Sequence, residues 1–383
     1  MNKDIGIYIH IPFCASKCFY CDFTSYCNMD DKIEKYIDSV CTEILQNIEI
    51  LSQYNITTVY FGGGTPSYID SKYIVKIMQV LKLLKKDESE FKEVTIELNP
   101  NSIQKEKITD YINSGINRFS IGLQSTHDQI LKSIGRKHTY NDFKNGLEIL
   151  SECGAKNISL DIIYPLPNLT LEQFNDTLDK VISLKENYNI KHISIYNLEI
   201  HPNTKLDFLL KNEFLTLPDE DEEYRMKNLL IKKLEEANFI QYEISNFSLD
   251  GYSSKHNLNY WNQGQYLGFG VSASSFFAGS RYTNTNSITD YIKNINNGIS
   301  TIAEKEDLDK LDMMKEYIIL KLRLKDGINT DEFMSKFGNN IFNIFKTELD
   351  YLISNNLIIH NNKNLYLSSR GKEIANFVWE KFI

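Results

Sequence analysis

The chain alternates between short β-type runs and helical patterns, and this alternation constrains its fold more than any other feature. Six runs rich in β-branched and aromatic residues are each followed by a segment with apolar residues at helical spacing. Strands separated by helices pair in parallel, because each helix returns the chain to the start of the next strand. We expect strands at 6–11, 57–61, 93–98, 118–122, 158–163 and 192–197, and helices near 31–49, 71–85, 103–114, 127–133, 140–152 and 170–185.

Six strand–helix units fit an incomplete (β/α)6 barrel of the TIM-like kind, so we predict an α/β fold with this barrel in residues 1–240. Ligands of such barrels bind at the C-terminal ends of the strands. The six expected strands end in polar or glycine residues, which supports a ligand site at that face. These residues are Cys14, Cys18, Cys21, the run 62–66, Glu97, Gln124, Asp161, Tyr196 and Asn197.

The pattern changes from about residue 241. Residues 241–300 hold a strand-like run, an aromatic-rich segment and several glycines, and we predict a loop-rich extension that closes over the barrel mouth. Residues 301–383 combine helical patterns with a hairpin around 361–364. This last segment predicts a small winged-helix-like C-terminal domain.

Three cysteines, Cys14, Cys18 and Cys21, stand in a C-x3-C-x2-C run directly after the first expected strand. Three thiolates on one tight loop can hold three irons of a cubane cluster and leave the fourth iron open, whereas Fe–S clusters normally take four Cys. A structural zinc site needs four ligands, and His10 could complete one. Zinc, three unrelated buried thiols, and Cys27 as a fourth cluster ligand at an unusual spacing therefore stay open as alternatives.

The glycine run 62–64 follows the second expected strand. Glycines let backbone N–H groups approach a ligand without interference from a Cβ atom. A tight turn would use the same residues, so the run gains significance from the cysteines expected at the same face. We expect the run, the open iron and Glu97 to form one pocket.

The composition disfavours several classes of function. A net charge of −9 argues against a nucleic-acid-binding protein, which needs Lys and Arg on one face to neutralise phosphates. The stretch 266–279 is too short and too rich in Ser and Gly to span a bilayer, and no signal peptide is recognised. The six cysteines are not spaced as a disulfide framework. We expect a cytoplasmic protein with no transmembrane segment and no nucleic-acid partner.

The motifs together resemble the radical S-adenosylmethionine (SAM) enzymes, and among them the coproporphyrinogen dehydrogenase-like group. The resemblance covers most of the first 200 residues in order and continues into the C-terminal domain. It implies a radical SAM barrel that carries a [4Fe–4S] cluster, with SAM chelating the open iron through its amino and carboxylate groups. The matching runs are 8–14, 18–21, 61–67, 96–100, 120–125, 134–138, 160–167, 192–197, 242–247 and 256–261.

Within this group the chain looks more like the HemW-type haem chaperones than like the dehydrogenase. The dehydrogenase usually carries a fourth Cys two residues after the third, where this chain has Phe23, and a long segment before the cluster loop. The chaperone branch has a Cys-Asp-Phe ending, matched by Cys21, Asp22 and Phe23. It also has a His-Asn-x-x-Tyr-Trp motif, matched by His256 to Trp261.

The resemblance also implies which residues bind the cofactors. The cluster ligands would be Cys14, Cys18 and Cys21. An Arg fits a carboxylate bidentately, and Asp or Glu suits ribose hydroxyls or an amino group. The positions that match SAM contacts of the family are Tyr8, Tyr20, Gly63, Gly64, Thr65, Glu97, Gln124, Arg136 and Asp161.

Haem is the expected cargo, with His256 as the expected ligand. Imidazole is a common ligand of haem iron, and Asn257, Tyr260 and Trp261 offer a polar group and flat apolar surface beside it. The rivals of His256 are His10, His138 and His201.

The sequence thus predicts a haem chaperone that delivers haem to a recipient protein and lacks coproporphyrinogen dehydrogenase activity. The alternative is an oxygen-independent coproporphyrinogen III oxidase, which decarboxylates a porphyrinogen propionate by means of a 5′-deoxyadenosyl radical. A third hypothesis, a DNA-binding regulator built on the C-terminal domain, conflicts with the acidic net charge.

Overall fold

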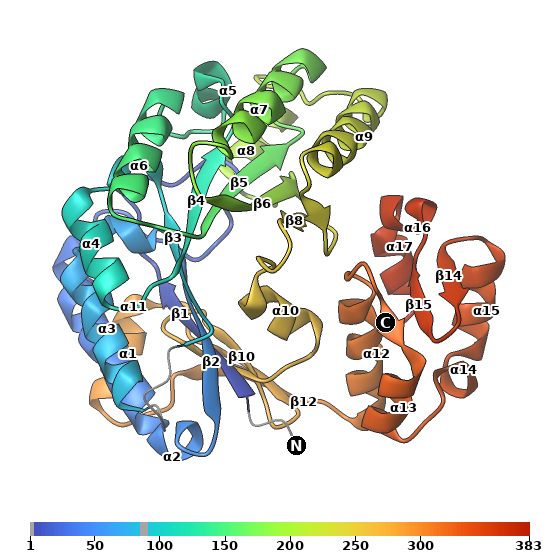
Figure 1. Ribbon diagram of the computed structural model, residues 1–383. Helices are drawn as coiled ribbons and strands as arrows, with labels where there is room; N and C mark the ends of the chain where they lie inside the picture. Colours follow the sequence, from blue (N-terminus) through green and yellow to red (C-terminus); the bar gives the residue numbers. More distant parts are fainter. Residues whose placement is uncertain (1–3, 85–90) are drawn as a thin grey trace.

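The computed structural model describes residues 4–84 and 91–383 (Figure 1). Its main feature is a twelve-stranded sheet with the order β12-β11-β10-β9-β1-β2-β3-β4-β5-β6-β8-β7. The strands β1 to β6 are parallel and neighbour one another in chain order, which confirms the predicted α/β fold. They are β1 (Asp4–Ile11), β2 (Asn55–Gly63), β3 (Glu93–Leu98), β4 (Arg118–Gln124), β5 (Ile158–Tyr164) and β6 (Ile190–Asn197).

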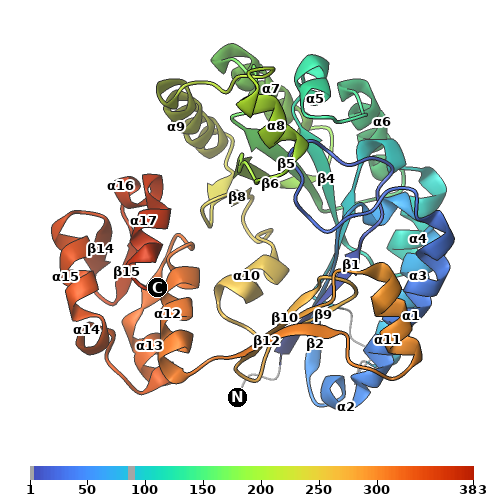
Figure 2. The ribbon, with the colours of Figure 1, turned by 180° about the vertical axis from the view of Figure 1, so that it is seen from behind.

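Helices cover the outer face of these six strands (Figures 1 and 2). The alternation in β1 explains this: Ile5, Ile7 and Ile9 are fully buried in the apolar core, whereas the Tyr8 ring faces Tyr60 of β2 on the other side. Each buried Ile stabilises the fold by roughly 1.5–3 kcal/mol relative to exposure. The helices are α1 (Ile33–Gln46), α2 (Ile48–Leu51), α3 (Ser71–Leu83), α4 (Lys105–Asn113), α5 (Asp128–Ser133), α6 (Tyr140–Glu152), α7 (Leu171–Leu184), α8 (Lys205–Lys211) and α9 (Glu220–Glu236).

The inner face of the six strands carries polar and aromatic side chains. Residues two apart on a strand share a face, so the inner face of β4 presents Arg118, Ser120, the backbone at Gly122, and Gln124. Its neighbour β5 presents Asp161, which accepts hydrogen bonds from Ser120 Oγ at 3.1 and 3.2 Å. The barrel interior is therefore built for polar contacts, unlike the outer face.

The segment 241–307 differs from the expected loop system over the barrel mouth, because its strands extend the sheet at both ends. The strand β9 (Tyr266–Phe269) pairs in parallel with β1, and β8 (Asn246–Ser248) pairs antiparallel with β6. Strands of two to six residues give too short a pattern to be recognised in the sequence. The remaining elements are β7 (Ile240–Gln241), β10 (Ser274–Phe277), β11 (Ser280–Asn284), α11 (Ile288–Asn296) and β12 (Ile302–Asp307).

The helix α10 (Lys255–Trp261), which contains the His-Asn-x-x-Tyr-Trp motif, also lies away from the mouth. Its N-terminus is hydrogen-bonded to Glu93, the first residue of β3, and His256 contacts Thr58 near the start of β2. The helix therefore closes the barrel at the N-terminal ends of the strands. Both ribbon views place it between the β1–β2 pair and the C-terminal domain (Figures 1 and 2).

The C-terminal segment forms a domain with its own apolar core, separate from the core of the large sheet. Helices surround a three-stranded sheet in the order β13-β15-β14, which includes the predicted hairpin. In the described part of the chain no helix is long and apolar enough to cross a membrane. The elements are α12 (Lys310–Lys321), β13 (Ile328–Asn329), α13 (Thr330–Phe337), α14 (Ile341–Ile344), α15 (Lys346–Ser354), β14 (Ile358–Asn361), β15 (Asn364–Leu367), α16 (Ser369–Glu373) and α17 (Ala375–Glu380).

Candidate functional site

The three predicted cluster ligands lie in the segment 12–29, here called the cysteine loop, which follows the C-terminal end of β1. At its base Cys14 N–H donates to the Tyr26 carbonyl at 3.0 Å, and Tyr26 N–H donates to the Pro12 carbonyl at 2.7 Å. Farther along, Phe19 N–H donates to the Ile134 carbonyl at 3.0 Å. The first two bonds thus close the base of the loop on itself, and the third fixes the loop to the segment that follows α5.

The three thiols have different neighbours. Cys14 is buried with Sγ 3.4 Å from Thr65 Oγ1, and Cys18 is half-buried with Sγ 3.7 Å from a guanidinium nitrogen of Arg136. Burial raises the pKa of Cys14 and raises that of Cys21 to about 11. Free thiols at these positions are therefore protonated, and binding iron would release their protons. The Arg136 cation would offset part of the negative charge of the bound thiolates.

The donor set fits a cubane cluster. Among residues 4–84 and 91–383, no three His, Cys, Asp or Glu side chains converge closely enough to hold a single metal ion. A cubane binds each thiolate at a different iron, so its ligands do not need to converge on one point. The zinc alternative would require His10, but both of its ring nitrogens already have partners. Its Nδ1 lies 3.0 Å from Tyr8 Oη, and its Nε2 lies 2.8 Å from the Thr24 carbonyl.

The glycine segment at the end of β2 packs against both the cysteine loop and the barrel interior. A Cβ atom on Gly64 would lie 3.0 Å from Cys14 Sγ. A Cβ atom on Gly62 would lie 3.1 Å from Glu97 Oε1 and 3.0 Å from the Tyr60 ring. These two positions, here called the glycine cradles, leave no room for a side chain, so the backbone stays close to Cys14 and Glu97.

The middle glycine has a different role. Gly63 has φ +113°, which favours glycine, and a Cβ atom there would lie 2.6 Å from the His10 ring. His10 in turn contacts the Thr24 carbonyl of the cysteine loop. A side chain at Gly63 would therefore disturb the support of the cysteine loop before it reached a ligand.

Two half-buried carboxylates face the barrel interior. Tyr60 Oη donates to Glu97 Oε1 at 2.8 Å, and Asp161 accepts from Ser120 Oγ. Burial raises the pKa of Glu97 to about 7 and that of Asp161 to about 6. Carboxyl groups with such shifted pKa values in a barrel interior are candidates for ligand binding.

The remaining predicted SAM contacts surround this region. Gln124 has a left-handed backbone (φ 65°), is 8% exposed, and its Oε1 has no hydrogen-bond partner among the described residues. An unpaired buried acceptor of this kind fits a donor on an incoming ligand. Arg136 donates to the Gly122 carbonyl at 2.6 Å, and the Tyr20 phenol lies beside Cys18 and Arg136. The predicted cluster and SAM residues therefore occupy one region at the C-terminal strand ends and the inner face below them.

His256 lies below that region, toward the N-terminal ends of the strands, and Tyr60 links the two. Its Nδ1 is 2.8 Å from Thr58 Oγ1, its Nε2 is 2.7 Å from Tyr260 Oη, and its ring stacks on Tyr60 at 5.2 Å. The residue is 1% exposed, and burial, with the nearby Arg118 cation, lowers its pKa to about 3. The imidazole is therefore neutral, and both nitrogens already have partners.

The rival histidines differ in accessibility. His138 is buried, with Nε2 3.2 Å from the Leu123 carbonyl, and burial lowers its pKa to about 4. His201 is partly exposed beside the cysteine loop, and its Nδ1 lies 3.2 Å from Asp22 Oδ2. Of the histidines considered for haem, His201 is the one that lies next to the cysteine loop with an exposed side chain.

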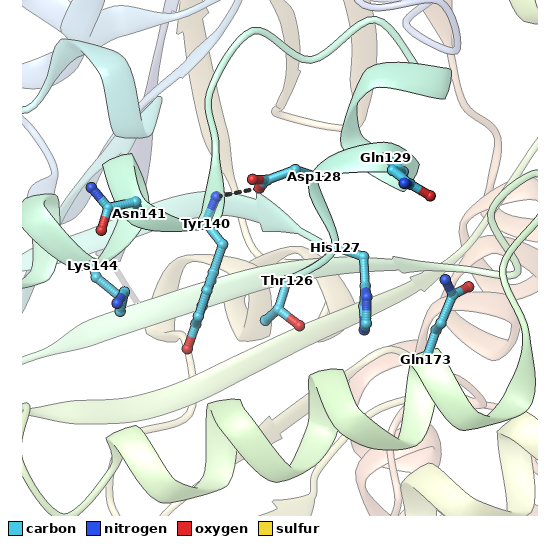
Figure 3. Close-up of a pocket in the computed structure, with 8 residues that line it drawn as sticks. All are labelled: Thr126, His127, Asp128, Gln129, Tyr140, Asn141, Lys144 and Gln173. Atoms are coloured by element: carbon cyan, nitrogen blue, oxygen red, sulfur yellow. Dashed lines mark hydrogen bonds between the residues drawn. The ribbon is translucent and has the colours of Figure 1, made fainter.

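A separate surface pocket of about 490 Å³ lies between the starts of α5, α6 and α7 (Figure 3). Its wall includes the Tyr140 amide, which donates to Asp128 Oδ1 at 2.8 Å. The pocket contains none of the predicted site residues. It is lined by Thr126, His127, Asp128, Gln129, Tyr140, Asn141, Lys144 and Gln173.

Several polar residues of the barrel interior were not predicted from the sequence. Tyr60 positions Glu97, Glu93 caps α10, and Arg118 lies buried beside the motif histidine. The sequence signal that could have found them is the two-residue period of a strand. Tyr60, Glu93 and Arg118 each share a strand face with a predicted site residue or glycine. What the sequence could not supply was the position of α10 over them.

Comparison with known proteins identifies the family. A radical SAM superfamily domain matches residues 8–181, and a HemN C-terminal domain matches residues 308–374. Heme chaperone HemW of Bacillus subtilis is 32% identical over 376 residues, which cover 98% of both chains. The chain belongs to the HemW family. Heme chaperone HemW of Lactococcus lactis is also 32% identical, over 100% of this chain and 98% of that protein.

The fold of this HemW-family chain also agrees with a solved structure. Coproporphyrinogen III oxidase (HemN) from Escherichia coli superposes with a TM-score of 0.86 over 100% of this chain and 90% of that chain, at 20% identity. At this identity the likeness establishes the shared fold. Membership of the radical SAM superfamily implies a [4Fe–4S] cluster and SAM, and the cysteine loop, the glycine cradles and the half-buried carboxylates fit both groups.

Proposed function

We propose that this chain is a haem chaperone, which binds haem and passes it to a haem-accepting protein. The observation that carries the proposal is the similarity to heme chaperone HemW of B. subtilis along the full length of both chains. The cofactor part of the proposal is supported by the three free cysteines on one loop beside the glycine cradles.

In this proposal Cys14, Cys18 and Cys21 hold the cluster, which supplies one-electron redox chemistry when bound. Arg136 stands beside Cys18 and suits the carboxylate of a cluster-bound SAM. Glu97 lies beneath the Gly62 cradle and suits an amino or hydroxyl group of the same ligand. The other proposed SAM contacts are Tyr8, Tyr20, Gly63, Gly64, Thr65, Gln124 and Asp161.

Haem is the proposed cargo, and His256 remains the proposed ligand of its iron. The neutral state of its imidazole suits metal binding. Because Thr58 and Tyr260 hold both ring nitrogens, one of these hydrogen bonds must break before iron can bind. Because the residue is also 1% exposed, we expect α10 to move relative to β2 when haem binds.

We also propose that the chain does not decarboxylate coproporphyrinogen. Phe23 stands where the dehydrogenase usually has a fourth Cys, and its side chain is 64% exposed on the cysteine loop. A protein of the HemN type would form protoporphyrinogen from coproporphyrinogen under anaerobic reducing conditions with SAM. We expect none, and product formation that depends on Cys14 would contradict this part of the proposal.

The cluster assignment has a matched control within the same loop. Ala at Cys14, Cys18 or Cys21 should abolish the iron–sulfur absorbance after anaerobic reconstitution, because each thiolate holds one iron. Cys27→Ala should retain it. Loss of the cluster in Cys27→Ala alone, or stable zinc without iron in the parent, would contradict the assignment.

A further inference from the structure

The guanidinium of Arg118 is deeply buried and incompletely hydrogen-bonded. The residue is 2% exposed and heads the group of largest fully buried side chains. Its Nε has no hydrogen-bond partner among the described residues. Burial lowers the pKa of the guanidinium, but the Glu93 carboxylate and other acidic neighbours raise it above its usual value, so they act on the cation through charge without a hydrogen bond from Nε. A buried donor that lacks an acceptor is unfavourable, because it has lost its hydration.

The acidic groups around Arg118 are already engaged. Glu93 accepts hydrogen bonds from Ser254 Oγ and from the Lys255 and His256 amides of α10. Asp161 accepts a hydrogen bond from Ser120 Oγ, and burial raises the pKa of its carboxyl group to about 6. The phenols of Tyr60 and Tyr242 complete the polar surroundings that influence this cation.

A second unpaired polar atom lies beside Arg118. Thr95 is its register partner on β3, is 0% exposed, and its Oγ1 has no hydrogen-bond partner in the described chain. A guanidinium and a hydroxyl side by side offer the donors that a carboxylate accepts. Arg118 and Thr95 therefore supply the donors that a carboxylate-binding site needs.

This pair lies farther down the barrel than the cysteine loop, although the Arg118 charge also acts to lower the pKa of Asp161 and of Glu97. Arg118 is the first residue of β4 and Gln124 is the last, so their Cα atoms are separated by roughly 20 Å along the strand. Arg118 instead lies next to α10, where its charge helps to lower the pKa of His256. A ligand at Arg118 would enter from the end of the barrel that α10 closes.

The contact that holds α10 in place is itself incompletely satisfied. Arg323 of the C-terminal domain lies between Trp261 of α10, at 4.5 Å, and Trp379, at 4.9 Å. Arg323 Nε and both indole Nε1 atoms are buried without hydrogen-bond partners among the described residues. The unpaired donors offset part of the attraction between the Arg323 cation and the two indole rings, and displacement of α10 would break the contact with Trp261.

We propose that Arg118, with Thr95, binds a carboxylate of a ligand that enters the barrel when α10 is displaced. The identity of the ligand rests on the proposed function: the ligand is haem, and the carboxylate is one of its propionates. This places the propionate on Arg118 and the iron within reach of the displaced His256. The propionate then supplies the hydrogen-bond acceptor that the Arg118 guanidinium lacks.

Arg118→Met tests the proposal, because Met keeps most of the length and removes the charge. The variant should melt close to the temperature of the parent, because removal of a buried charge offsets the lost attraction to Glu93. Its affinity for haem should fall at least tenfold. Arg225→Met is the control, because Arg225 is exposed on α9 and its Nε donates to the Asp221 carbonyl of the same helix; it should bind haem normally.

Haem dimethyl ester and SAM identify the ligand group. The parent should bind the ester at least tenfold more weakly than haem, and Arg118→Met should bind the two forms equally. Retained discrimination in Arg118→Met overturns the proposal, and so does a variant weakened for SAM but not for haem. If the parent binds neither haem form, the proposed function itself fails and this inference with it.

Discussion

Glu97 combines partial burial, a titratable charge and a place beneath the Gly62 cradle. The pKa of its carboxyl group is raised to about 7, first by burial and then by Asp161, while the Tyr60 hydrogen bond opposes the shift. In the unfolded chain the group titrates near its ordinary value, so between the two values the folded protein holds a proton that the unfolded chain has released. Stability from this group therefore falls as the pH rises from about 4.5 to 7.

Glu97→Gln should remove that pH dependence, because the amide cannot ionise and still accepts from Tyr60. The free energy of unfolding of the variant, measured with the ligand-free protein, should rise relative to the parent by about 2 kcal/mol between pH 5 and pH 8. Chemical denaturation at the two pH values measures the difference. If the variant and the parent differed in free energy of unfolding by the same amount at both pH values, the pKa of Glu97 would not be raised by the fold.

Gly62 and Gly64 allow the SAM and cluster contributions to be separated. Gly62→Ala places a methyl group against Glu97 and Tyr60, so SAM affinity should fall about tenfold, or 1.4 kcal/mol. The iron–sulfur absorbance should be unchanged. Gly64→Ala places its methyl group against Cys14 and should disturb the cluster instead. If both variants behaved alike, the two cradles would not serve different groups.

At the scale of elements, α10 depends on a carboxylate that belongs to another part of the chain. Glu93 is 4% exposed and accepts from Ser254 Oγ and from the Lys255 and His256 amides. These charge-assisted hydrogen bonds fix the start of the helix, and no residue within α10 replaces them.

Glu93→Ala should destabilise the protein by about 3 kcal/mol, since it leaves buried donors unpaired and removes the acidic neighbour of Arg118. Amide hydrogen exchange in α10 should accelerate more than exchange in α1, which is remote from Glu93. Glu93→Gln keeps an acceptor and should lie between the parent and Glu93→Ala. Unchanged protection of α10 in Glu93→Ala would contradict this account of the helix.

The elements of the barrel were predictable because each carries a repeated signal. The alternation in β1 and the capping box of Thr170 with Gln173 at the start of α7 are examples, and both are present in the structure. The extension was predicted wrongly because β7 to β10 contain two to four residues each. The pairing of β9 with β1 and of β8 with β6 depends on tertiary contacts that no local pattern encodes.

At the scale of the whole molecule, the sequence indicated the candidate site because parallel strands bring their C-terminal ends together. Cys14, Glu97, Gln124 and Asp161 could thus be grouped without knowledge of any contact. The unpaired Nε of Arg118 could not be predicted in this way. It depends on which acids α10 and Ser120 have already engaged, and α10 reaches them only through the folded arrangement.

The barrel therefore has two chemically different ends. The C-terminal strand ends carry the cysteine loop and the glycine cradles, whereas Arg118 lies toward the N-terminal ends beside α10, which contacts α12 of the C-terminal domain (Figure 1). This arrangement separates the proposed cofactor site from the proposed cargo site within one sheet. A haem chaperone needs such a separation if its cargo is to leave while the cofactors stay.

Anaerobic titration of the reconstituted full-length chain with haem, followed by the Soret absorbance, tests the central claim most directly. We predict a band that saturates at a single equivalent of haem per chain while the iron–sulfur absorbance is retained, and that weakens or shifts in His256→Ala. A linear rise without saturation, as for haem in buffer, would contradict the assignment of this chain as a haem chaperone.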